Sequence, residues 1–132
     1  MKLVKDNKSK SLSYRIKPSI HQLNKAKILQ KNKDNKEDIS RICLNSSSRD
    51  NFHQMIIFQT SRYKAEIKKN INKDKSFILL HGKQIIRIYD KNKKIKKKIL
   101  LDQNNFLCWI KKNPYYDNIY LGSNSVHIES LA

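Results

Sequence analysis

The pattern of hydrophobic and polar positions changes near residue 40. Before that point the chain is mostly polar, and apolar residues recur at helical spacing within SIHQLNKAKILQKN (19–32), just after Pro18 and Ser19. A proline and a serine ahead of an apolar periodic run are typical of a helix start. The pattern therefore predicts one short helix within 19–32, followed by a solvated linker at 31–38. Its apolar positions are Ile20, Leu23, Ala26, Ile28 and Leu29.

Beyond residue 40, short runs rich in β-branched and aromatic residues alternate with polar turns. Many short strands at close, regular spacing favour an all-β sandwich or barrel. We therefore expect two parts: residues 1–39, a polar and partly flexible segment with one short helix, and residues 40–132, a β-barrel. The predicted strands are RICLN (41–45), HQMIIFQT (53–60), RYKAEIK (62–68), SFILLHG (76–82), QIIRIYD (84–90), KKKILLD (96–102), NFLCWIK (105–111), NIYLG (118–122) and VHIES (126–130).

The clearest local prediction is a hairpin over QIIRIYDKNKKIKKKILLD (84–102). Ile86 and Ile88 alternate with Arg87 on the first strand, and Ile99 and Leu101 flank Leu100 on the second. Alternation of this kind indicates strands with one buried face. Leu100 departs from it, since an apolar residue falls where a polar one is expected.

Composition adds a strong positive charge. The formal net charge is +18, from 29 basic and 11 acidic residues. Such a field attracts polyanions. However, 24 of the basic residues are Lys and only five are Arg, although Arg is the usual choice for specific phosphate recognition. Lys, Asn and Ile, all with A/T-rich codons, are over-represented together. Compositional bias therefore explains the charge better than a nucleic-acid partner does.

The lysine run KNKKIKKK (91–98) is interpreted in the same way. It holds six lysines at the tip of the predicted hairpin. Lysines on an exposed strand keep it soluble, and no aromatic platform for bases accompanies them. A basic nucleic-acid-binding β domain therefore stays only as an alternative.

The two cysteines, Cys43 and Cys108, lie in apolar runs and far apart, which predicts buried free thiols rather than a zinc site. No secretory signal and no membrane-spanning run is visible. We therefore expect a cytoplasmic protein. Catalytic motifs are also missing from the sequence: with two glycines there is no phosphate loop, and no nucleophile elbow occurs. Four scattered histidines, His21, His53, His81 and His127, give no metal-ligand spacing.

Three ordered segments resemble a known family. SRICLNSSSRDNFHQMIIFQT (40–60), NINKDKSFILLHGKQIIRIYDKNKKI (70–95) and NFLCWIKKNPYYDNIYL (105–121) are similar to the WbuC-type small cupins of polysaccharide and O-antigen gene clusters. The resemblance extends over about residues 40 to 130. It implies a cupin double-stranded β-helix, or jelly-roll, barrel with a divalent metal held by three His and one Glu.

At the four positions that match those ligands, this chain has Lys68, Asn70, Lys75 and Asp117. A protonated lysine has no lone pair to give to a metal, and two lysines repel a cation. The resemblance thus implies a degenerate cupin with no metal and no cofactor. The same four residues are a candidate pocket for an anionic sugar or a nucleotide-sugar. The loss of the metal ligands favours a binding protein over an enzyme.

The resemblance also carries open alternatives. A metal-independent sugar isomerase or epimerase would need a general base, and His53 and His81 are the nearest candidates. Cupin barrels often pair, so a homodimer is a possible assembly, although no residue fixes one.

Overall fold

The computed structural model describes residues 3–5, 12–16, 24–44, 52–69, 73–111 and 115–131. They form one helix and a largely antiparallel nine-stranded sheet in which the strands follow the order β1-β2-β3-β4-β9-β6-β7, with β5 on β9 and β8 on β6. Within these ranges no helix is long and apolar enough to cross a membrane. The strands are β1 Leu3–Lys5, β2 Leu12–Ile16, β3 Ile39–Cys43, β4 His53–Thr60, β5 Lys68–Lys69, β6 Lys75–Tyr89, β7 Ile95–Leu101, β8 Leu107–Ile110 and β9 Tyr115–Leu131, and the helix is α1 Lys25–Asp34.

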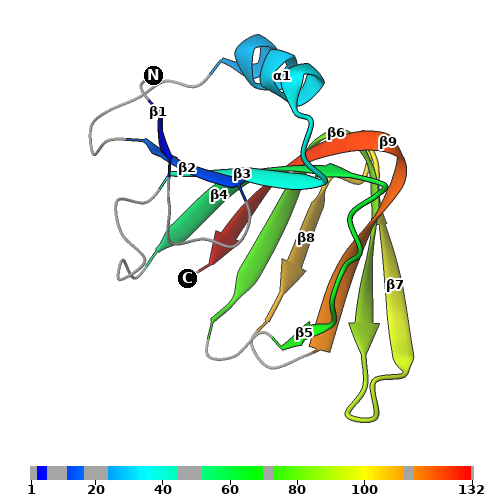
Figure 1. The fold of residues 1–132 in the computed structure, drawn as a ribbon. Helices are drawn as coiled ribbons and strands as arrows, with labels where there is room; N and C mark the ends of the chain where they lie inside the picture. The colour runs from blue at the N-terminus through cyan, green and yellow to red at the C-terminus, as the bar shows by residue number, and fades with distance from the viewer. Residues whose placement is uncertain are drawn as a thin grey trace.

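Two long strands close the sheet on itself. The first part of β6 pairs with β8 and with the end of β9, whereas its second part pairs with β7 and with the start of β9. The end of β9 pairs in addition with β4. Figure 1 shows β9 curving over the top of the molecule from the side of β5 to the side of β4. Both strands therefore belong to two walls of one barrel.

The bend in β6 corrects the sequence prediction. SFILLHG and QIIRIYD were predicted as separate strands, but they form one strand. The register between β6 and β9 shifts between Leu79 and His81 and again between His81 and Lys83, and Gly82 has a φ of 86°. Glycine reaches this left-handed region without a Cβ clash, so the chain bends without leaving the sheet.

The hairpin between β6 and β7 is confirmed. Ile86 lies opposite Ile99 and Ile85 opposite Leu100, and Lys93 takes a positive φ in the connecting turn. Leu100 is 49% exposed, whereas Leu101 is buried. The alternation is thus kept in three dimensions, and Leu100 is an apolar residue on the outer face. Residues 91–98 are all exposed, as expected of a lysine-rich hairpin tip.

The helix is confirmed but begins later than predicted. Asn24 caps it by accepting hydrogen bonds from the backbone amides of Ala26 and Lys27. It extends to Asp34, into the predicted linker, and residues 17–23 lie outside the described part of the chain. Ile28 packs on the outer face of the sheet in a cluster with Ile42, Ile56, Phe58 and Val126.

A second cluster fills the barrel interior. It consists of Phe77, Leu79, Ile86, Leu101, Cys108, Ile110 and Tyr116. Cys43 and Cys108 are both buried and neither is in a disulfide, as predicted. Two strand predictions need correction: RYKAEIK is not a strand except at Lys68, where β5 begins, and NIYLG and VHIES are parts of the single strand β9. β1 and β2 were not foreseen, and β2 pairs in parallel with β3. The division between residues 1–39 and 40–132 stays a prediction.

Candidate functional site

A charged cluster lies inside the barrel, around Lys75 at the start of β6. Its ammonium donates a hydrogen bond to the Tyr116 hydroxyl and lies 2.5 Å from Oε1 of Glu129. Lys75 and Glu129 come from neighbouring strands of one wall, and Tyr116 comes from the other part of β9. The contact therefore joins two walls of the barrel, and Tyr116 also meets Phe77 edge to face.

Burial and charge act against each other in this cluster. Burial alone would lower the pKa of Lys75, but Glu129 and Tyr116 raise it above the usual value. Burial likewise disfavours the Glu129 carboxylate, yet the proximity of His127 and of the Lys75 ammonium lowers its pKa to about 2. Burial raises the pKa of Tyr116, which stays protonated at neutral pH. The pair is therefore an ammonium and a carboxylate, each dependent on the other.

His127 extends the cluster. Its Nδ1 lies 2.7 Å from Nε2 of Gln84, which also donates to the Ser125 hydroxyl at 2.8 Å. Because an amide nitrogen can only donate, Nδ1 accepts, and the proton of the neutral ring resides on Nε2. Nε2 points to Oε2 of Glu129 at 3.6 Å, an electrostatic contact too long for a hydrogen bond. Gln84 thus fixes the tautomer that faces the carboxylate.

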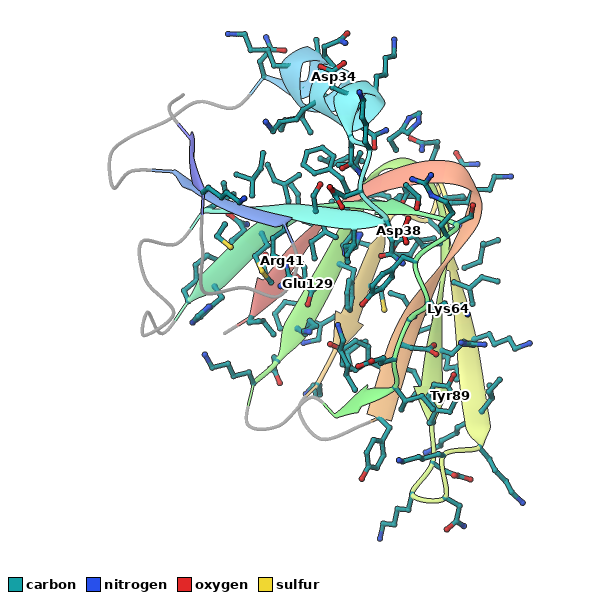
Figure 2. The ribbon with its side chains drawn as sticks, viewed as in Figure 1. Asp34, Asp38, Arg41, Lys64, Tyr89 and Glu129 are labelled. Carbon is teal, nitrogen blue, oxygen red and sulfur yellow. The ribbon has the colours of Figure 1, made fainter. Side chains whose placement is uncertain are left out.

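Lys68 lies at the edge of the same interior. It pairs directly with Tyr116 across β5 and β9, so the two side chains share a face of the sheet. Much of the residue is exposed. Loss of hydration nevertheless lowers the pKa of Lys68; Glu129 opposes this change, and the cations Lys75 and Arg41 add to it. Figure 2 shows Arg41 and Glu129 close to each other below β3.

Asp117 belongs to a different cluster. It follows Tyr116 on β9, and successive residues of a strand point to opposite faces. Arg87 donates to both of its carboxylate oxygens, at 2.7 and 2.5 Å, and the Tyr89 hydroxyl donates to Oδ2 at 2.7 Å. Figure 2 shows Tyr89 near the hairpin end of β6, away from Glu129. The structure thus brings Lys68 and Lys75 together and places Asp117 apart, while Asn70 lies outside the described residues.

These residues do not fit the divalent metal that the resemblance implies. The ammonium of Lys75 is engaged with Glu129, and both oxygens of Asp117 are engaged with Arg87. Within the described ranges no group of three His, Cys, Asp or Glu side chains is placed to hold an ion. Among the described residues, the ammonium of Lys75 is a buried cation inside the barrel.

Sequence reasoning missed the partners of Lys75. His127 and Glu129 alternate with Val126 and Ile128, a pattern that favours polar side chains on the outer face. In the structure Val126 and His127 are both fully buried, because α1 and its cluster cover the outer face. The usable signal was the spacing itself: two ionisable residues two positions apart on a strand share a face.

Comparison with known proteins gives structural neighbours only, since no protein-family model and no curated protein matches the chain. The cupin domain of Cnp3 from Schizosaccharomyces pombe is 13% identical over 74% of this chain and 63% of that chain, with a TM-score of 0.60. Hydroxypropylphosphonic acid epoxidase from S. wedmorenis is 13% identical over 67% of this chain and 47% of its own, with a TM-score of 0.56.

An HTH_3 family transcriptional regulator from Vibrio cholerae is 7% identical over 72% of this chain and 51% of its own, with a TM-score of 0.56. The chain thus spans between about half and two-thirds of the length of these three structures. The three names differ in function, and what they share with this chain is the barrel. The chain has an all-β cupin fold, as the sequence predicted.

Proposed function

We propose that this protein is a metal-independent binding barrel for an anionic sugar or nucleotide-sugar. The observation that carries the proposal is the position of Lys68, exposed at the edge of the interior beside the cations Lys75 and Arg41. Lys75 already has Glu129 as its partner. Loss of hydration is the main cause of the lowered pKa of Lys68, and a carboxylate or phosphate bound there would favour the charged form of this lysine.

Binding ranks above catalysis because of where the histidines lie. His81 is exposed, and His53 is only half-buried, at the start of β4 and at the margin of the barrel. His127 does lie in the interior, beside Glu129, and this contact supports a sugar isomerase or epimerase as the second candidate. His127 has no exposed surface, however, so a substrate would reach it only after the barrel opens. Turnover of a dTDP-sugar panel that disappears in His127→Gln would favour the enzyme.

The biological setting of the proposal comes from the sequence motifs. Their resemblance to the WbuC-type small cupins supports a role in surface polysaccharide synthesis, where charged sugars and nucleotide-sugars are the substrates. Two buried free thiols support a reducing, cytoplasmic location. A homodimer is compatible with this proposal, which does not depend on the oligomeric state.

Calorimetric titration with UDP-glucuronic acid tests the proposal. We expect binding to the unmodified protein and about tenfold or greater weakening in Lys68→Gln, because a hydrogen bond to a charged group contributes roughly 1.5–3 kcal/mol. Lys64→Gln is the matched control, since it removes one exposed lysine from the segment before β5. Equal affinity in Lys68→Gln and the unmodified protein would refute the proposal, as would equal weakening in both variants.

The pH dependence gives a second check on Lys68. Its pKa is lowered from 10.5, so its charge is lost at a lower pH than that of an ordinary lysine. We expect affinity for UDP-glucuronic acid to be constant near neutral pH and to fall as the pH rises toward this lowered pKa. The same titration with Lys68→Gln should show no such fall; an identical alkaline decline in that variant would assign the decline to another group.

A further inference from the structure

An open hollow of about 250 Å³ lies against the wall of the barrel that β8, β6 and the end of β9 form. Two exposed aromatic side chains border it: Trp109 of β8 is 64% exposed and Phe52, just before β4, is 53% exposed. Large exposed aromatic residues on a soluble protein are informative when they gather at a concave site. The lining residues are Phe52, Asp74, Lys75, Ser76, Trp109 and Ser130.

The strand register explains how these residues meet. Trp109 lies opposite Ser76, Ser76 opposite Ser130, and Ser130 opposite Gln54. Residues directly opposite one another share a face of the sheet, so the four side chains form one row across β8, β6, β9 and β4. Gln54 donates to the Ser130 hydroxyl at 3.2 Å. The row faces outward, because the next residues in register are buried in the interior: Cys108, Phe77 and Glu129.

The row lies just beyond the part of the outer face that α1 and its apolar cluster cover. Two residues farther along the same face, β4 and β9 carry Ile56 and Ile128, which pack in the cluster beneath α1. At the row the corresponding residues are Gln54 and Ser130, as expected for a surface that meets water. Solubility accounts for the serines and the glutamine, but not for an indole and a phenyl ring at the same place.

We propose that this hollow binds one neutral pyranose ring. A pyranose has an apolar C–H face, which can stack on Trp109 or Phe52, and a rim of hydroxyls, which match Ser76 and Ser130. About 250 Å³ is below the roughly 300–1,000 Å³ of sites that enclose drug-sized ligands, which suits a single ring.

The charges of the lining favour a neutral sugar over an anion. The ammonium of Lys75 points into the interior, to Glu129 and Tyr116, so it does not serve the hollow. Asp74 also lines the hollow, and a carboxylate at this place does not favour a bound phosphate. Apart from Lys75, whose ammonium is turned to the interior, the site has other residues and another charge preference than the one proposed at Lys68, and each can fail without the other.

Trp109 is the single tryptophan of the chain and reports on the hollow directly. We expect its emission to change on titration with glucose, galactose, N-acetylglucosamine or rhamnose in the millimolar range. Phe52→Ala should weaken the responding sugar by about threefold to tenfold through loss of one stacking surface. Leu107→Ala is the matched control, because Leu107 is 56% exposed on the same face of β8 and does not line the hollow.

Three results would overturn the proposal. The first is unchanged Trp109 emission with all four sugars. The second is a loss of the sugar response in Lys68→Gln, which would mean that the sugar binds at the Lys68 site and not at a separate site in the hollow. The third is an emission shift that follows protein concentration instead of sugar, with a dimer mass by light scattering that Trp109→Ala abolishes. That result would make the hollow a contact between two copies of the chain.

Discussion

At the scale of single residues, Lys75 sets the character of the interior. An ammonium that is 7% exposed needs a fixed negative partner, and Glu129 supplies it at 2.5 Å. Removing water from both ions costs several kcal/mol each, so the pair is tolerated rather than strongly stabilising. What the pair does fix is geometry: it ties the start of β6 to β9, and Tyr116 extends the tie to the other wall.

Replacing one partner of this pair should be far worse than replacing both. Lys75→Met leaves the Glu129 carboxylate buried without its cation, and we expect a loss of about 3–5 kcal/mol in the free energy of unfolding. The double variant Lys75→Met/Glu129→Leu should recover most of that loss. Urea unfolding followed by circular dichroism measures both. A double variant as unstable as the single one would show that the pair supplies net stability.

Protonation of Glu129 should account for much of the stability that the protein loses at acid pH. The pKa of Glu129 is about 2 in the folded protein and 4.5 in the reference state, so its contribution is present above pH 4.5 and disappears as the pH falls toward 2. The urea midpoint should be flat from about pH 7 to 5 and then decline. The double variant Lys75→Met/Glu129→Leu should decline less steeply; a decline of equal slope would point to other carboxylates.

At the scale of elements, the hairpin was predictable and the long strands were not. The hairpin follows from local alternation, which Ile86 and Leu101 display without help from distant residues. The continuity of β6 depends on a bulge at His81 and Gly82, and a glycine between two apolar runs resembles a turn in sequence. The orientation of His127 depends on α1, which covers the outer face and comes from a distant part of the chain. No local pattern contains that information.

The helix contributes through Ile28, its buried residue in the outer cluster. Ile28→Ala removes apolar contacts with Ile42, Ile56 and Phe58, and we expect a loss of about 2–5 kcal/mol in the free energy of unfolding. Lys27→Ala, on the exposed side of the same turn, should change it by less than about 0.5 kcal/mol. Similar urea midpoints for the two variants would mean that α1 does not cover the sheet in solution.

At the scale of the whole molecule, the fold carries a net charge of +18, much of it displayed at the hairpin tip of β6 and β7. The lysines there are all exposed, and each carries its charge at the end of a flexible side chain that does not bind anions in one fixed geometry. The resemblance grouped Lys68 and Lys75 with Asp117, which Arg87 holds on the other face, and it did not suggest Glu129; whether Lys68 and Lys75 form a pocket stays a prediction.

Polyanion binding should therefore separate from sugar binding. The variant Lys96→Gln/Lys97→Gln/Lys98→Gln should elute from heparin at clearly lower salt, because fewer lysines then neutralise sulfate groups and release their counterions. The same variant should bind UDP-glucuronic acid as the unmodified protein does. A matching decrease in both assays would indicate one non-specific electrostatic surface and would weaken the case for Lys68.

The position of β9 also has a consequence for synthesis on the ribosome. Residues 124–131 pair with β4 on one side and β6 on the other, so the centre of the sheet is made by the part of the described chain that is translated last. Until residue 131 has left the exit tunnel, β4 and β6 have no strand between them. Until then the nascent chain carries the edges of β4 and β6 without the strand that pairs with both, and these edges are open to pairing with neighbouring chains.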